Sequence, residues 1–124
     1  MEYNPYALTG KTILVTGASS GIGRAVAIEC SRLGAHVILS ARNKEKLEET
    51  LKMMEGHGHQ VIECDLSKEK EVSLLIDEVP EIQGLVNNAG TTMTVPVPFI
   101  KFNVLSDLLK VNTIAPIMIL SGLV

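Results

Sequence analysis

Short apolar runs rich in β-branched residues alternate along the chain with segments in which apolar residues recur at helical spacing. The apolar runs lie at residues 13–17, 36–41, 60–64 and 84–88. The first run, ILVTG, is continuous, which is expected of a strand covered on both faces. Strands that alternate with helices are typical of βαβ units. The pattern therefore predicts an α/β fold with a doubly wound parallel sheet, ending after its fourth strand and the following helix.

The helical segments have recognisable faces and ends. Residues at i, i+4, i+8 and i+11 predict one buried face of the first helix: Ile22, Val26, Cys30 and Leu33. Gly34 is a natural stop for that helix, and Pro80 ends the third one. Asn43 and Ser67 stand where the second and third helices need an N-cap. A last helical segment begins at about residue 104.

The chain closes on an unusually apolar stretch, KVNTIAPIMILSGLV. A membrane span needs about 20 apolar residues, and the run from Ile114 falls well short of that, so we expect no membrane segment. Helical spacing places Asn112 on one apolar face with Leu105, Leu108, Leu109 and Ile119, where an amide must be hydrogen-bonded. Pro116 has no N–H, so the carbonyl of Asn112 loses its helical partner and could bind a water. The alternative is an asparagine satisfied locally beside a packing kink.

Composition narrows the class of protein. Hydrophobic residues make up 46% of the 124 residues and charged residues 20%, the balance of a globular domain. The net charge of −3 argues against a nucleic-acid partner, which would need a basic surface. Cys30 and Cys64 form no CxxC pair, and the N-terminal residues lack the apolar core of a signal peptide, so we expect a cytoplasmic protein with reduced thiols. His57 and His59 have no third ligand at suitable spacing, so no metal site is predicted.

A glycine-rich turn, TGASSGIG, joins the first predicted strand to the first helix. Gly17, Gly21 and Gly23 allow a sharp backbone turn that can approach a pyrophosphate, which the amides of the following helix would bind. Ser19 and Ser20 could add hydroxyl donors. The alternative is a tight turn that needs glycine only for its conformation.

The end of the second strand indicates which nucleotide would bind. A site for NAD places Asp or Glu about 20 residues after the glycines, to hold the ribose 2′-hydroxyl. Here Ser40, Ala41 and Arg42 occupy that region, and Lys44 and Lys46 add positive charge nearby. Arginine can hold a 2′-phosphate through two parallel hydrogen bonds, so the cofactor is predicted to be NADP(H). The alternative is that Arg42 is an ordinary solvated residue at the start of a helix.

TGASSGIG followed by NNAG at residues 87–90, each directly after a predicted strand, resembles the short-chain dehydrogenase/reductase family. The likeness runs from Leu8 to the end of the chain, and its pattern is most similar to 3-oxoacyl-[acyl carrier protein] reductases. It implies a Rossmann-type fold in which residues 1–124 are the N-terminal part of a single NADP-binding domain.

The resemblance implies a cofactor role for each matching position. The cofactor loop would be formed by Gly17, Ser19, Ser20, Gly21, Ile22 and Gly23. The adenine ring would be held by Asp65 and Leu66, and the adenosine ribose would be lined by Asn88, Ala89 and Gly90. Asn87 matches a sheet-stabilising asparagine, and Arg42 the basic residue of NADP-preferring members. Ser20 is a departure, because some of those members carry a second basic residue there.

Asn112 matches the asparagine of the family's Asn-Ser-Tyr-Lys tetrad, whose backbone carbonyl holds a water in the family's proton relay. The serine and the Tyr-x-x-x-Lys motif do not occur here, since the only tyrosines are Tyr3 and Tyr6. Without that tyrosine and lysine no group can protonate a developing alkoxide, so we expect the chain to be inactive alone.

Two functions remain open on the sequence. In the first, the intact protein is an NADP(H)-dependent oxidoreductase that transfers hydride between nicotinamide and the carbon of a small carbonyl or alcohol substrate, and it is a homodimer or homotetramer. In the second, the chain is a non-catalytic NADP(H)-binding or subunit-interaction module. Neither function requires nucleic acid or a membrane.

Overall fold

Four parallel strands form one sheet, in the order β3-β2-β1-β4, in the computed structural model of the protein, which describes residues 3–91 and 93–123. The strands are β1 (Thr12–Thr16), β2 (His36–Ala41), β3 (Gln60–Glu63) and β4 (Gly84–Val86). In the register of the sheet, Leu14 lies opposite Ile38 on β2 and Leu85 on β4. The order reverses direction after β3, which confirms the predicted doubly wound, Rossmann-type fold. The edges of the sheet are β3 and β4.

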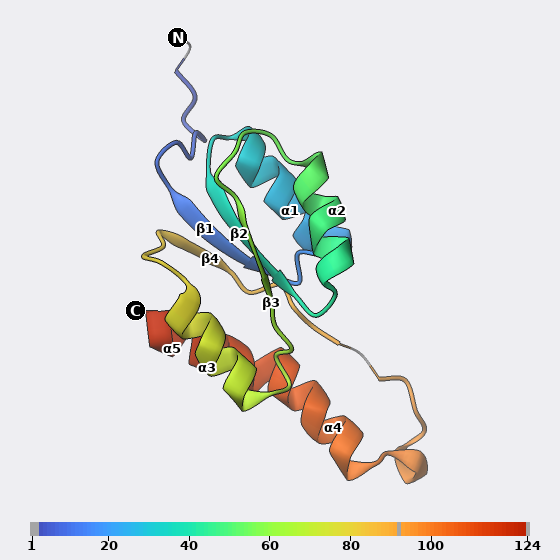
Figure 1. Ribbon diagram of the computed structural model, residues 1–124. Helices are drawn as coiled ribbons and strands as arrows, with labels where there is room; N and C mark the ends of the chain where they lie inside the picture. The colour runs from blue at the N-terminus through green and yellow to red at the C-terminus, as the bar shows by residue number, and fades with distance from the viewer. Residues whose placement is uncertain (1–2, 92, 124) are drawn as a thin grey trace.

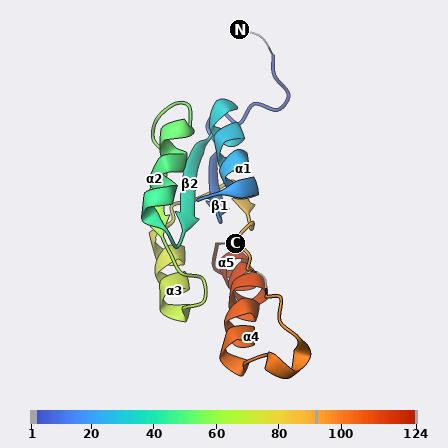
Figure 2. The same cartoon turned by 90° about the vertical axis from the view of Figure 1, so that its right-hand side faces the viewer.

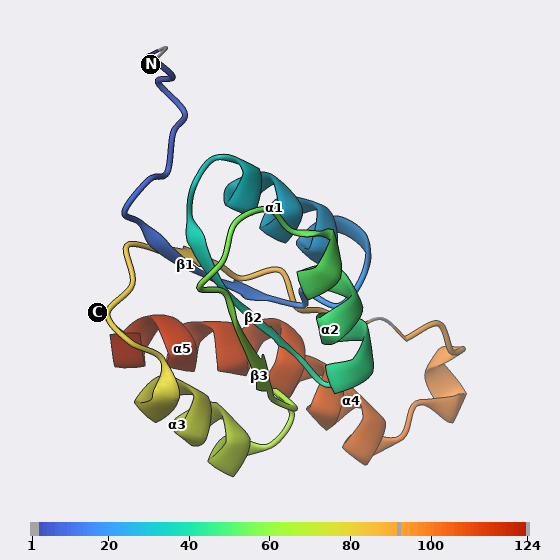
Figure 3. The ribbon, with the colours of Figure 1, turned by 45° about the horizontal axis from the view of Figure 1, so that its top comes forward.

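Helices cover both faces of this sheet (Figures 1 and 3). On one face lie α1 (Gly21–Arg32) and α2 (Lys44–Met53). On the other lie α3 (Glu69–Glu78) and α5 (Ala115–Leu123). A 3-10 turn (Val97–Phe99), α4 (Phe102–Leu109) and a π-helical segment (Lys110–Ile114) precede α5, and α4 projects away from the sheet (Figure 2).

The core has two layers because successive strand residues point to opposite faces of the sheet. In the layer on the side of α1 and α2, the strand residues Val15, Val37 and Leu39 are fully buried together with Ala27 of α1 and Leu47 of α2. The opposite layer is formed by Leu14, Ile38, Leu75, Ala115 and Ile119. Coverage on both faces explains why the strands are continuously apolar.

The predicted buried face of α1 is confirmed only in part, because Val26 and Cys30 are partly buried against the core. Its buried residues are Gly23, Ala27 and Ser31, and Ile22 is 74% exposed. Small residues are buried because α1 approaches the glycine turn and the sheet closely. The predicted end of the helix is confirmed, since α1 stops at Arg32 and Gly34 follows with φ 99°.

The two predicted N-caps have different outcomes. Asn43 caps α2, because its Oδ1 accepts a hydrogen bond of 3.1 Å from the backbone N–H of Lys46. Ser67 does not cap α3, whose N-cap position is Lys68. The Ser67 hydroxyl instead donates to Oδ1 of Asp65 at 2.7 Å, which makes it part of the turn after β3.

The face predicted for the last helix is also wrong in part. Val111, Ala115 and Ile119 are buried, whereas Leu105 and Leu109 are exposed and Asn112 lies on the exposed side. The reason is the π-helical segment, where the N–H of Ala115 bonds the carbonyl of Lys110, five residues earlier. This wider turn shifts the side chains before it relative to those after it, which regular helical spacing cannot anticipate.

The last helix is longer than its apolar end suggested. Residues 102–123 form one helix of 22 residues with mean hydropathy 1.4, long and apolar enough to cross a membrane by length and composition alone. A core helix of a soluble protein, which is mostly buried, meets the same criterion, whereas 17% of the most apolar window of this helix is buried. Here Ile119 is fully buried beneath the sheet, and Lys110 pairs with Asp107 at 3.8 Å in the middle of the helix. The last residue of the apolar run, and the first two residues of the chain, lie outside the described residues.

Candidate functional site

A cleft of about 400 Å³ opens at the carboxyl ends of β1, β2 and β4. It lies where the strand order reverses, which is the usual ligand site of an open α/β sheet. It is lined by Gly17, Ser19, Ser20, Ser40, Ala41, Arg42, Asn43, Lys46, Cys64, Leu66, Asn88, Ala89, Gly90, Thr91 and Val111.

The fold brings most of the predicted site residues to this one cleft. Eight of them line it: Gly17, Ser19, Ser20, Arg42, Leu66, Asn88, Ala89 and Gly90. Five do not: Gly21, Ile22, Gly23, Asp65 and Asn112. Gly21 and Gly23 shape the turn beside the cleft, while the Ile22 side chain extends into solvent.

The glycine turn depends on two different properties of glycine. Gly17 and Gly21 have φ of 64° and 56°, a conformation that other residues rarely adopt. Gly23 has no such φ, but a Cβ there would overlap the carbonyl oxygen of Gly17 and lie 2.5 Å from Nδ2 of Asn88. Apart from its chain neighbours and the backbone of α1, no atom of the described residues lies within 4 Å of where a Cβ at Gly21 would be, so the turn is open on that side.

The segment after β4 is tied directly to the end of β1. The backbone N–H groups of Asn88 and Ala89 both donate to the Thr16 hydroxyl at 3.1 Å, and Nδ2 of Asn88 donates to the carbonyl of Gly17 at 3.3 Å. Asn87 is exposed, so the asparagine that links the strand ends is Asn88 and not Asn87. No pattern in the sequence marks Thr16, since a threonine is ordinary in a strand.

The side chain of Asn112 binds the backbone of the loop beside the cleft. Its Oδ1 accepts from the N–H of Thr91 and its Nδ2 donates to the carbonyl of Thr91, both at 2.7 Å. The amide thus satisfies both backbone groups of a residue that lines the cleft, and it fixes this loop to the π-helical segment. The catalytic role expected for Asn112 stays a prediction.

The charges around the cleft favour an anion. Arg42 and Lys46 line it, and no carboxylate is among its lining residues. Burial alone would raise the pKa of Asp65, but hydrogen bonds from the hydroxyl and amide of Ser67, and the charges of Arg42 and Lys68, hold it below its ordinary value. Asp65 therefore stays ionised behind the cleft.

The cleft holds no reactive thiol or metal centre in the part of the chain that the structure describes. Burial raises the pKa of the Cys64 thiol to about 12, with smaller contributions from Glu71 and Asp65, so that thiol is protonated at neutral pH. Among the described residues no group of three His, Cys, Asp or Glu side chains could hold a metal ion.

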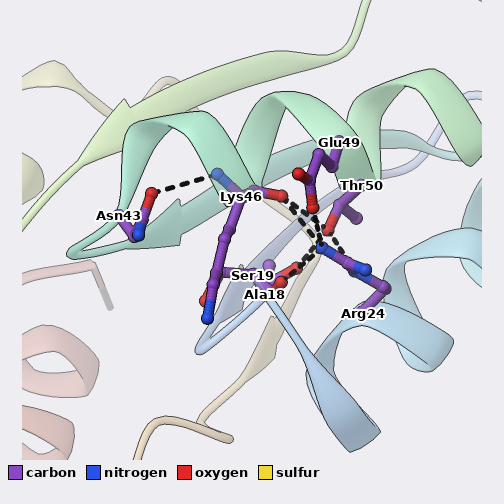
Figure 4. A network of polar contacts seen from close by, with 7 residues as sticks. All are labelled: Ala18, Ser19, Arg24, Asn43, Lys46, Glu49 and Thr50. Atoms are coloured by element: carbon purple, nitrogen blue, oxygen red, sulfur yellow. Dashed lines mark hydrogen bonds and ion pairs between the residues drawn. The ribbon is translucent and has the colours of Figure 1, made fainter.

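A polar network joins the glycine turn to α2 (Figure 4). Arg24 donates from Nε to the Thr50 hydroxyl at 2.8 Å, and from Nη2 to the carbonyls of Ser19 at 2.6 Å and Lys46 at 3.1 Å. The buried Thr50 hydroxyl donates to the carbonyl of Ala18 at 2.8 Å. No local pattern marked Arg24 or Thr50, because their partners lie on other elements.

Comparison with known proteins identifies the family that the two sequence motifs resemble. The sequence pattern of the short chain dehydrogenase family matches residues 11–124. A 3-oxoacyl-[acyl-carrier-protein] reductase FabG of Rickettsia felis is 45% identical over 85 residues, which cover 68% of this chain and 35% of that protein. The 3-ketodihydrosphingosine reductase of Mus musculus is 38% identical over 119 residues, covering 87% of this chain and 36% of that protein.

Solved structures share the fold as well. The crystal structure of a metagenomic short-chain oxidoreductase in complex with NADP superposes with a TM-score of 0.84 and 34% identity, covering 93% of this chain and 55% of the other. The chain thus spans little more than a third of the curated relatives' length and about half of that solved chain. With the family pattern matched from residue 11 to residue 124 on a doubly wound sheet, this chain belongs to the short-chain dehydrogenase family.

Proposed function

We propose that the cleft binds NADP(H), and that the whole protein is an oxidoreductase that transfers hydride between nicotinamide and a carbonyl or alcohol carbon. The observation that carries the cofactor proposal is the charge of the cleft, which is lined by Arg42 and Lys46 and by no carboxylate. A site for NAD uses an acid at this strand end, and an acid would repel a 2′-phosphate. Arg42 directly follows β2 and can bind a phosphate through two parallel hydrogen bonds.

The remaining cofactor positions follow from the geometry of the strand ends. The open glycine turn and the first amides of α1 suit the pyrophosphate. Leu66, buried in the cleft wall, suits the adenine ring, together with Asp65. Asn88, Ala89 and Gly90 suit the adenosine ribose.

The names of similar proteins support this proposal. The relatives from Rickettsia felis and Mus musculus are both named as reductases, and one similar solved structure contains NADP. We therefore propose a small-molecule carbonyl or alcohol as the substrate of the whole protein. From the sequence alone we also propose a cytoplasmic location and a homodimer or homotetramer.

For the 124 residues by themselves we expect cofactor binding without turnover. Tyr3 and Tyr6 are the only tyrosines, and neither lines the cleft. A carbonyl reduction needs a positioned acid for the developing alkoxide, and these residues contain no Tyr-x-x-x-Lys pair to supply it. When bound, the cofactor would supply the hydride, while the chain's own residues would hold and orient it.

Titration with NADPH and NADH, followed by nucleotide fluorescence, tests the proposal. We expect NADPH to bind roughly tenfold more tightly or better, because charged hydrogen bonds to phosphate are the strong ones. Arg42→Met should remove most of that preference. Arg32→Met, which removes an arginine of α1 that pairs with Glu29 outside the cleft, is the matched control and should keep it. Equal or tighter binding of NADH would contradict the proposal.

A second candidate is a non-catalytic NADP(H)-binding or subunit-interaction module, the alternative that the sequence leaves open. The reading frame after codon 124 separates the two candidates. A frame that supplies a serine and Tyr-x-x-x-Lys supports the enzyme, and a stop codon supports the module.

A further inference from the structure

A 2′-phosphate needs more positive charge than one arginine supplies. A phosphate monoester carries about −1.5 to −2 charge at pH 7, so Arg42 alone leaves part of it uncompensated. The glycine turn offers no second cation, because Ser19 and Ser20 are its only polar side chains at the cleft. Three other basic residues lie in the first turns of the neighbouring helices α1 and α2: Arg24, Lys44 and Lys46.

Arg24 is excluded by its existing bonds. Its guanidinium donates to two backbone carbonyls and to the Thr50 hydroxyl, and it pairs with Glu49 at 3.4 Å. It does not line the cleft. Arg24 therefore holds the turn in place and is not available to a ligand.

Lys44 is excluded by its position. It lines a separate, shallow hollow, where two carboxylates, Glu45 and Glu63, accompany it. Those acids would repel a phosphate at that place. Arg42 borders both hollows, but Lys46 borders only the cleft.

Lys46 lines the cleft, and its backbone is held in place by hydrogen bonds, as a residue that binds a phosphate requires. Its N–H donates to the Asn43 cap, and its carbonyl accepts from Arg24, which also binds the carbonyl of Ser19. The backbone of Lys46 is therefore fixed relative to the glycine turn, and Figure 4 shows its side chain running from α2 toward that turn. Of the four ion pairs within residues 3–91 and 93–123, none involves Lys46 or Arg42.

We propose that Lys46, from the first turn of α2, is the second cation of the 2′-phosphate subsite and a determinant of the preference for NADP(H). Lys46 supplies the second positive charge that Ser20, in the glycine turn, cannot supply. This inference rests on the proposed function, and it adds a residue that the glycine turn and the end of β2 do not contain.

The test uses nucleotides that differ only in the 2′-phosphate. Binding of adenosine 2′,5′-bisphosphate and adenosine 5′-monophosphate to the 124-residue chain is measured by calorimetry at low salt. Lys46→Met should weaken the bisphosphate tenfold or more and change the monophosphate less than twofold, because one charged hydrogen bond to the 2′-phosphate is lost. Lys46→Arg should bind the bisphosphate within about threefold of the unaltered chain, since it keeps the cation.

Lys44→Met is the matched control, since it removes the same charge from the same turn of α2 but outside the cleft. It should change neither affinity more than twofold. Equal losses in both lysine variants, or an equal loss for both nucleotides in Lys46→Met, would overturn the role of Lys46. If the unaltered chain binds the two nucleotides equally or not at all, the proposed NADP(H) function itself fails. If the unaltered chain prefers the bisphosphate and only Arg42→Met removes that preference, the function stands and the inference about Lys46 fails.

Discussion

At the scale of single residues, Gly23 shows how closely α1 approaches the cleft. It lies inside a helix, where alanine is intrinsically more favourable than glycine by about 1 kcal/mol. A methyl group there would nevertheless overlap the carbonyl oxygen of Gly17 and crowd Asn88. Both neighbours belong to the walls of the cleft, so neither can move without changing the site.

Helix propensity alone predicts that Gly23→Ala raises the free energy of unfolding, but we expect this substitution to lower it. Overpacking should lower the free energy of unfolding by about 1–3 kcal/mol, and the displaced turn should weaken NADPH binding. Urea unfolding followed by circular dichroism measures the first effect and nucleotide fluorescence the second. For the unfolding measurement alone, Gly90→Ala is the control, because a Cβ at Gly90 would meet Oδ1 of Asn112 at an ordinary 3.5 Å. A Gly23→Ala chain as stable as the unaltered one would contradict the close approach.

At the scale of elements, the glycine turn and α2 behave as one unit. The Thr50 hydroxyl is fully buried, and it both donates to Ala18 and accepts from Arg24. Through Arg24, the same network reaches Ser19 and Lys46, two residues of different elements that both line the cleft. The positions of the phosphate turn and of the basic first turn of α2 are therefore linked.

Replacing Thr50 by valine keeps the shape and removes the hydroxyl. It leaves the carbonyl of Ala18 and Nε of Arg24 without this partner, so we expect the free energy of unfolding to fall by about 1–3 kcal/mol. Binding of NADPH should weaken more than binding of NADH, because the network holds Lys46. Thr113→Val, at an exposed threonine of the last helix, should change neither quantity. Equal behaviour of the two variants in urea unfolding would argue against the link.

The last helix is irregular close to a proline. Pro116 cannot donate a hydrogen bond, and its ring crowds the carbonyl four residues earlier. The helix widens into its π-helical segment, which ends two residues before this proline. That segment contains Asn112, whose side chain holds Thr91 at the cleft. The irregularity of the helix therefore coincides with its connection to the site.

At the scale of the whole molecule, one surface is unusually apolar. Large hydrophobic side chains are exposed along the last helix: Phe102, Val104, Leu105, Leu109, Ile114, Ile117, Met118 and Leu120. The edge strand β4 adds unpaired backbone groups. Exposed apolar patches and free strand edges favour association.

We therefore expect the 124-residue chain to self-associate in solution. Ile117→Lys combined with Leu120→Lys should shift it toward the monomer, because the patch gains charge at two positions that are 60% and 53% exposed. Sedimentation velocity over a range of protein concentrations measures this shift. Leu74→Lys, at a 63% exposed position on α3, is the control and should leave association unchanged. A stable monomer of the unaltered chain at high concentration would contradict the expectation.

The elements themselves were predictable from local patterns. Continuous apolar strands, the Asn43 cap and the stop at Gly34 depend on neighbours in the sequence, and the structure confirms each of them. The face of α1 and the face of the last helix were not predictable in this way. The first depends on how closely a helix approaches a turn, and the second on a change of helical register.

The sequence by itself determined the order of strands and helices and brought the glycine turn, Arg42 and the NNAG segment to the same end of the sheet, because parallel strands gather their carboxyl ends at one edge. Only the tertiary structure decided which side chains hold that edge together. The Thr16 hydroxyl binds backbone groups 72 and 73 positions away, Arg24 binds Thr50 26 positions away, and Asn112 binds Thr91 21 positions away. Such partners are set by the packing of separate elements, and no local pattern of apolar and polar residues encodes them.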